Sequence, residues 1–130
     1  MKNNIKLEEL AMFGLSIYLF NQTDFSWWWY PLLILTPDLG MIGYALNTRT
    51  GAISYNLFHH KGIALIVLVA GWYFNDNWLE LAGIILFGHA SMDRIFGYGL
   101  KYNDHFKHTH LGWIDESSQP NPPTQYEKSN

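Results

Sequence analysis

Residues 87–101 read FGHASMDRIFGYGLK, and they place a histidine, an aspartate and an arginine at the end of a long apolar run. His89 and Asp93 are four residues apart, so on a helix they share one face, whereas Arg94 projects about 100° away from Asp93. The Gly-Tyr-Gly that follows predicts the end of this helix. A buried imidazole and a buried carboxylate need polar partners, because an unpaired buried charge is costly. The stretch therefore predicts an all-α fold with a polar cluster inside an apolar core.

The composition limits both the size and the class of the protein. A chain of 130 residues forms a single domain. Charged residues make up 15% of the chain, against about 25% in a typical soluble domain, and they lie mainly outside an apolar middle from about residue 10 to 100. The net charge is -3 and there is no basic stripe, so we expect no nucleic-acid partner. Cysteine is absent, which excludes disulfides and thiolate ligands.

The hydrophobic pattern predicts four helices in one domain that covers residues 1–114. We expect them near residues 7–21, 28–46, 52–74 and 78–98, with Pro37 kinking the second. An ordered segment at 101–114 should follow and fold back under the helices. Residues 115–130 are rich in Ser, Pro, Asn and Gln and predict a disordered polar tail.

The predicted helices are apolar nearly all round, which favours a membrane over water as their surroundings. Tryptophans flank the turns, and the basic residues fall mainly on one side of a four-span layout. We therefore expect a four-helix transmembrane bundle in the cell membrane, multi-pass, with both termini cytoplasmic. The lipid bilayer is the predicted partner, and a homo-oligomer is compatible with this arrangement. The alternative is a soluble all-α bundle, because 52–74 reaches spanning length only if His59, His60 and Lys61 are included.

Several short motifs, in this order and spacing, carry a family resemblance. They are PDLGMIGY at 37–44, YNLFHH at 55–60, HASMDR at 89–94 with GYGLK at 97–101, and THLG at 109–112. Over roughly residues 7 to 114 the chain resembles the small bacterial membrane proteins grouped as the DUF4260 family. The resemblance implies a compact membrane protein of about four helices and leaves the activity open.

Nearly all the polar groups of the apolar middle can be brought into one cluster. We predict that it lies toward the cytoplasmic ends of the second, third and fourth helices and contains Asp38, Asn56, His59, His89, Asp93 and Arg94. Asp93 should face His59 or His110, and Arg94 should reach Asp38 or the carbonyls freed by Pro37. Whether His59 or its neighbour His60 faces the cluster is left open.

The chemistry of this set points to a divalent metal. We propose His59, His89, Asp93 and His110 as ligands, with Asp38 nearby, because imidazoles and carboxylates without thiolates suit zinc, iron or manganese. No HExxH or GxSxG motif is present. Two classes of function remain. One is a non-catalytic membrane protein whose cluster binds a small ligand or ion, or holds helices together. The alternative is a metal-dependent, hydrolase-like membrane enzyme that acts on a lipid or other amphiphile.

Overall fold

A computed structural model describes residues 1–120, and this part of the chain is almost entirely helical. Its helices and strands are α1 Lys2–Asn21, α2 Trp29–Leu33, the 3-10 helix η1 Thr36–Ala45, α3 Thr48–His59, α4 Lys61–Phe74, α5 Asn77–Ile95, β1 His108–Thr109, β2 Gly112–Trp113 and the 3-10 helix η2 Glu116–Ser118. The predicted all-α class is confirmed.

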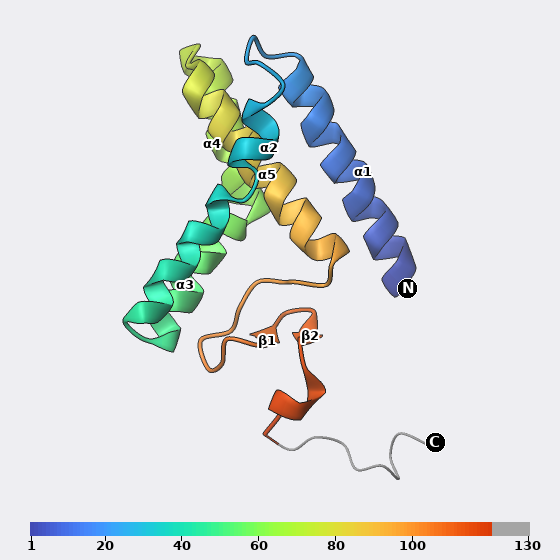
Figure 1. Cartoon of the computed structure of the whole chain (residues 1–130), viewed down its shortest axis with the longest axis vertical. Coiled ribbons are helices and arrows are strands. Elements are labelled where there is room, and N and C mark those ends of the chain that lie inside the picture. Colours follow the sequence, from blue (N-terminus) through green and yellow to red (C-terminus); the bar gives the residue numbers. More distant parts are fainter. Residues whose placement is uncertain (121–130) are drawn as a thin grey trace.

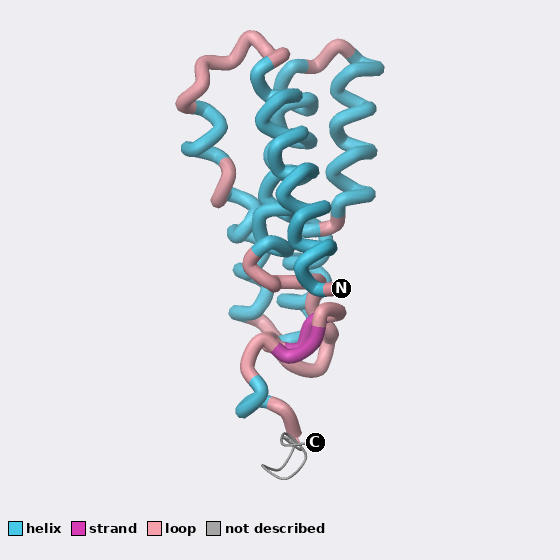
Figure 2. Tube along the Cα trace, turned by 90° about the vertical axis from the view of Figure 1, so that its right-hand side faces the viewer, coloured by secondary structure: helices cyan, strands magenta, loops and turns pink. Residues whose placement is uncertain are grey.

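Two helical units meet at the middle of the molecule (Figure 1). Helices α1, α4 and α5 run side by side along the long axis, as Figure 2 also shows, and α5 packs against both of the others. The 3-10 helix η1 and α3 pack together as a second, smaller unit, which we call the η1–α3 hairpin; it projects away from the three-helix unit. The short strands β1 and β2 lie beyond the end of α5.

The three-helix unit is held by an apolar core between α1, α4 and α5. Phe20, Leu68, Leu81 and Ile84 form its buried cluster together with neighbouring residues. Gly83 lets the backbones of α4 and α5 approach closely, because a Cβ at this position would lie 2.5 Å from the backbone nitrogen of Leu68. The contact between α4 and α5 therefore depends on the absence of a side chain there.

Two of the predicted helices are interrupted. The segment 28–46 was predicted as one kinked helix, but it divides into α2 and η1, because Pro37 has no backbone N–H to continue the α-helical pattern and the chain adopts 3-10 geometry from Thr36 onward. The segment 52–74 divides at His60, whose backbone is extended and whose Nδ1 accepts a hydrogen bond from the Gly62 N–H at 3.1 Å. His60 is thus the N-cap of α4, a role more common for Ser, Thr, Asp or Asn.

The outer boundaries also differ from the prediction. The first helix begins at Lys2 rather than near residue 7, since nothing in residues 2–6 breaks a helix. The last begins at Asn77 and ends at Ile95, and Gly97 follows with a φ of 92°, a conformation that favours glycine. The predicted tail starts with η2, and residues 121–130 lie outside the described part of the chain.

The predicted membrane spans can be compared with the helices by length and hydropathy. Among residues 1–120 no helix is by itself both long and apolar enough to cross a bilayer. Only α3 and α4 taken together satisfy these criteria, and they are bent by 48° where they meet.

Candidate metal centre

Four side chains from three elements converge where the η1–α3 hairpin meets α5. Asp38 lies in the first turn of η1, His59 is the last residue of α3, and His89 and Asp93 lie one turn apart on α5. One ligand atom from each lies within 4.8 Å of the corresponding atom of every other. The helix period predicts the His89–Asp93 pair, and the break after α2 turns Asp38 toward it.

The spacing between these atoms matches the coordination sphere of a metal ion. The two Nε2 atoms lie 3.0 Å apart, and Asp38 Oδ1 lies 3.5 Å from His59 Nε2 and 3.2 Å from His89 Nε2. The Asp93 oxygens lie 3.4 Å and 3.6 Å from the same two nitrogens. Ligands of a tetrahedral zinc ion with bonds of 2.0–2.2 Å are about 3.3–3.6 Å apart. The distances of 3.4, 3.5 and 3.6 Å lie in this range, and those of 3.0 and 3.2 Å are shorter, toward the closer spacing of adjacent ligands in an octahedral site.

The hydrogen bonds fix which ring nitrogens face the centre. His89 Nδ1 lies 2.5 Å from the Ile34 carbonyl oxygen, and His59 Nδ1 lies 2.8 Å from that of Tyr55. A carbonyl only accepts, so each Nδ1 must carry the proton and donate it. In the neutral rings both Nε2 atoms then present lone pairs to each other and to two carboxylates. Such an inward-facing set of acceptors calls for a cation, and an outer N–H donated to a backbone carbonyl is what metal-bound histidines commonly show.

The Ile34 carbonyl is available because the helix is broken. In a continuous α-helix it would accept from the Asp38 N–H, but that N–H bonds instead to Leu35 in the 3-10 pattern. The 3-10 geometry at Asp38 therefore contributes to the site by freeing the carbonyl that orients His89. The sequence analysis predicted carbonyls freed near Pro37 but assigned them to Arg94.

Tyr55 supports two of the four side chains, and the sequence analysis missed this role. Its ring stacks on the His59 imidazole with 3.7 Å between centroids and 13° between planes. Its hydroxyl donates to Asp93 Oδ2 at 2.9 Å. Tyr55 precedes His59 by four residues on α3, so the same spacing that pairs His89 with Asp93 could have indicated it.

One side of the cluster is closed and the other opens to a pocket. His89 is fully buried and His59 nearly so, whereas the Asp38 side chain is 39% exposed. Asp38 and Asp93 line a pocket of about 350 Å³, together with residues that include Tyr98, Lys101 and Lys107. A bound cation would therefore face solvent, or a ligand, on its carboxylate side.

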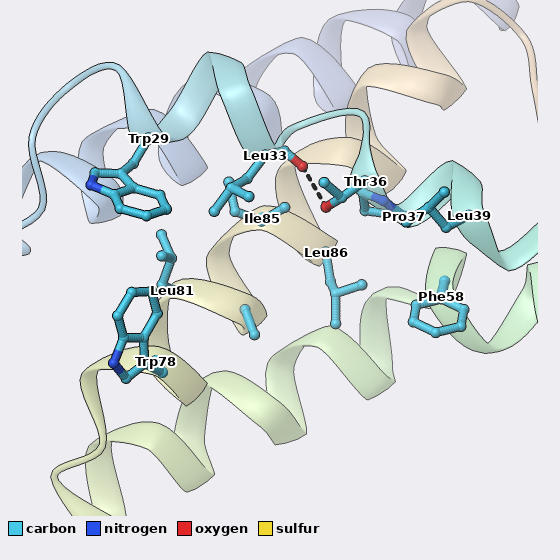
Figure 3. Close-up of a pocket in the computed structure, with 11 residues that line it drawn as sticks. Trp29, Leu33, Thr36, Pro37, Leu39, Phe58, Trp78, Leu81, Ile85 and Leu86 are labelled. Carbon is cyan, nitrogen blue, oxygen red and sulfur yellow. Dashed lines mark hydrogen bonds between the residues drawn. The ribbon is translucent and has the colours of Figure 1, made fainter.

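A second, apolar groove of about 500 Å³ lies beside the same turn of η1 (Figure 3). Trp29, Leu81, Ile85 and Phe58 are among the side chains that line it, and Pro37 and Leu39, the neighbours of Asp38, close one end. The turn around Asp38 thus contributes to an apolar groove as well as to the pocket that contains the carboxylates.

Asn56 and Arg94 lie near the cluster without joining the four. The Asn56 side chain pairs with the backbone of Lys101: its Nδ2 donates to the carbonyl at 2.8 Å, and its Oδ1 accepts from the N–H at 2.7 Å. Arg94 Nη2 lies 3.5 Å from the His59 carbonyl oxygen, where it interacts with the C-terminus of α3, and it forms no ion pair with Asp38. The predicted Arg94–Asp38 pair is therefore wrong.

His110 is also outside the group of four. Its Nδ1 accepts a hydrogen bond from the Leu100 N–H at 2.8 Å, which ties the β1–β2 turn to the segment after α5. Burial, and next the nearby positive charge of Arg94, lower the pKa of the His110 imidazole. Of the two adjacent histidines left open by the sequence, His59 faces the centre and His60 caps α4.

Lys101 is the second residue near the site that the sequence analysis did not include. It is 6% exposed, and its ammonium lies 4.0 Å from the Phe106 ring centroid and 4.9 Å from that of Tyr55. Burial lowers the pKa of this ammonium, while the charges of Asp93 and Asp38 act in the opposite direction. The lysine therefore introduces a cation beside the two carboxylates.

The fold and the site together define a helical protein with a buried cluster of two histidines and two aspartates. Residues 2–114 match the family described as "Domain of unknown function (DUF4260)", and the chain belongs to this family. The resemblance stated from the short motifs is thereby confirmed. No curated protein and no solved structure was found to match the chain.

Proposed function

We propose that the protein binds one divalent metal ion through Asp38, His59, His89 and Asp93. The observation that supports this most is the convergence of the Nε2 atoms of two histidines with two carboxylates, 3.0–3.6 Å apart where measured against the histidines. Two aspartates balance the charge of a divalent ion, so the centre would be neutral when filled. Without a cation, the Nε2 atoms and the carboxylates face one another, and the Tyr55 hydroxyl, which donates to Asp93 Oδ2, satisfies one of the carboxylate oxygens.

A proton shared between the two imidazoles is the competing explanation, and metal analysis separates the two. We expect protein purified in detergent to hold about one equivalent of zinc, iron or manganese, or to take it up after chelation. His89→Ala should lose this binding, whereas His60→Ala, which alters only a helix cap, should keep it. Circular dichroism of both variants checks that they are folded. Wild-type protein that binds none of the three metals would refute the proposal.

We further propose that the helices lie in a lipid bilayer, with both termini on the cytoplasmic side. Large apolar side chains point outward over the three-helix unit: Leu7, Leu10 and Tyr18 on α1 and Ile66 and Val69 on α4 are each more than half exposed. An apolar surface that extends along two helices is unfavourable in contact with water. Helix α1 has 20 residues and so is about 30 Å long, comparable to the hydrocarbon thickness of a bilayer.

The ends of the three-helix unit differ in the way that this orientation requires. The exposed Trp27, Trp72 and Trp78 lie near the turn after α1 and the turn between α4 and α5, which are at the same end of the molecule. Lys2 is at the start of α1 and Arg94 is near the end of α5, so both lie at the end of the unit away from these tryptophans. Tryptophan at an interface and positive charge on the cytoplasmic side are the usual pattern. Extraction of the protein into the soluble fraction by alkaline carbonate would contradict the placement of its helices in the bilayer.

A second candidate function is metal-dependent hydrolysis of an amphiphile, and the position of the pocket favours it. Both carboxylates border open space, and an apolar groove lies on the other side of the same turn. A divalent ion would supply a water molecule of lowered pKa. Asp38 is exposed enough to accept a proton from such a water, while the Tyr55 hydroxyl holds Asp93 in place. Phosphodiester and ester lipid analogues, assayed with and without metal on wild type and Asp38→Asn, test this; equal turnover in all samples would refute it.

A further inference from the structure

We propose that the pocket beside the metal centre binds an oxyanion, a phosphate or carboxylate group, held between the metal ion and the ammonium of Lys101. This inference rests on the proposed metal site and names its ligand class. It starts from Lys101, a buried lysine that borders the same pocket as Asp38 and Asp93.

The Lys101 ammonium forms no direct ion pair within the described chain, although the charges of Asp93 and Asp38 are near enough to favour its charged form. No carboxylate oxygen of residues 1–120 forms an ion pair with its ammonium at 4.0 Å or less; its nearest recorded contacts are the faces of the Phe106 and Tyr55 rings. Lys61, which is partly buried, contrasts with it, because Lys61 pairs with the buried Glu9. A lysine that is 6% exposed and lacks such a partner is rare, since burying a charge is costly unless it is compensated.

The backbone around Lys101 is held in place, which fixes the position from which its side chain extends along the pocket. The Asn56 side chain pairs with both the N–H and the C=O of Lys101. A bridge between Lys101 and Thr109 connects the same residue to β1. The pair of hydrogen bonds explains why a polar residue on α3 is directed at the chain after α5. Asn56, which the sequence placed in the cluster, is thus a positioning residue for Lys101.

The charges around the pocket leave one positive charge over when the metal is bound. The ion and the two aspartates cancel. Lys107, which also lines the pocket, pairs with Asp115 at 3.3 Å. Lys101 remains, so a singly negative group would complete the balance. Lysine and a divalent ion together are a common arrangement for binding phosphate. The pocket volume of about 350 Å³ is at the lower end for small-ligand sites, which suits a headgroup.

Two sources could supply this oxyanion: a small soluble anion, or the headgroup of an anionic lipid. The apolar groove that begins at Pro37 and Leu39, next to Asp38, offers space for hydrocarbon close to the headgroup pocket. The two sources share the same polar contacts, so the experiment must include both.

The test uses full-length protein in detergent, loaded with Co²⁺, whose visible absorption reports ligands that enter the coordination sphere. The protein is titrated with inorganic phosphate, with acetate, and with phosphatidic acid or phosphatidylcholine in mixed micelles. We expect phosphate, acetate or phosphatidic acid to change the spectrum in a saturable way, and phosphatidylcholine to require a much higher concentration. A response to phosphatidic acid alone would identify a lipid headgroup as the ligand. A response to phosphate as well would show that the site also binds soluble anions.

Variants then locate the oxyanion. Lys101→Met should raise its half-saturating concentration at least tenfold, yet bind Co²⁺ no more weakly than wild type, because a cation beside the metal has been removed. Lys101→Arg should restore most of the response. Lys107→Met should have a smaller effect, and Lys6→Met, the same charge change on α1 outside this pocket, should have none.

The outcomes separate this inference from the one it rests on. Wild-type protein that takes up no Co²⁺ would refute the metal centre and the oxyanion site together. Co²⁺ uptake with no spectral response to any of the oxyanions would refute the oxyanion site alone. So would a Lys101→Met variant whose half-saturating concentration stays within twofold of wild type.

Discussion

Replacing Tyr55 by phenylalanine isolates the contribution of one hydroxyl to the metal centre. The substitution removes the hydrogen bond from the tyrosine hydroxyl to Asp93 Oδ2, 2.9 Å long, and keeps the ring that stacks on His59. Shape and apolar packing are therefore nearly unchanged, and the predicted effect falls on the orientation and charge of one ligand.

The size of the effect can be worked out from that bond. A hydrogen bond to a charged group contributes about 1.5–3 kcal/mol. The Asp93 side chain is 15% exposed, so water replaces part of what is lost and the lower end of the range applies. At about 1.4 kcal/mol per factor of ten, the metal dissociation constant should rise about tenfold. Losses of 10- to 100-fold are typical when a partner of a metal ligand is removed.

Competition with a chromophoric chelator measures the dissociation constant for Zn²⁺ in wild type and variant. Tyr44→Phe is a matched control, because the Tyr44 hydroxyl is buried and has no hydrogen-bond partner among the described residues. Its removal should leave metal affinity unchanged. If the two variants bind Zn²⁺ equally well, or if Tyr44→Phe is the weaker binder, the role assigned to Tyr55 is wrong.

Three further predictions follow from the structure. Chelation with EDTA should lower the melting temperature of wild-type protein and leave that of His89→Ala unchanged, because only the wild type has a bound ion to lose; equal shifts would contradict the site. Gly83→Ala should destabilise the protein, since its methyl group would meet the backbone of α4, whereas Gly14→Ala, which meets nothing within 4 Å, should stabilise it by about 0.5–1 kcal/mol; thermal unfolding measures both. The pKa of Asp104 is lowered, chiefly by its hydrogen bond from the imidazole four residues further on, so this contact is present above the usual aspartate pKa and is lost as pH falls below it; NMR shifts of the β1–β2 turn that stay constant through this acid range would refute the assignment.

The sequence was sufficient to predict the pairing of site residues within a helix. His89 and Asp93 follow from the helix period alone, and the need of buried polar groups for partners added Asp38 and one of the neighbours His59 and His60. What could not be predicted is the identity of partners across elements. Arg94 was assigned to Asp38 or to carbonyls freed by Pro37, yet it interacts with the C-terminus of α3, because the carbonyl of His59 has no partner within its own helix.

The same limit applies to the fold. Apolar periodicity predicted helical content and roughly where the long helices lie. It did not predict the break at His60, where an imidazole takes the N-cap position usually held by a small polar residue. Nor did it predict that the ten residues Thr36–Ala45, with Pro37 in their first turn, would adopt 3-10 geometry. Both breaks depend on how the η1–α3 hairpin packs against α5, and a pattern of hydrophobicity within one segment contains no such information.

The ligands of the centre are distributed along the chain from residue 38 to residue 93. No short segment of a growing polypeptide contains the set, and the last two ligands are synthesised near the end of the helical part. If the four residues bind a metal as proposed, the nascent chain cannot recruit the ion early, as a compact zinc finger can. Insertion of the metal would then be a late step of maturation, after α5 has packed. The cell would then need to deliver the ion to an already folded protein, through the opening beside Asp38.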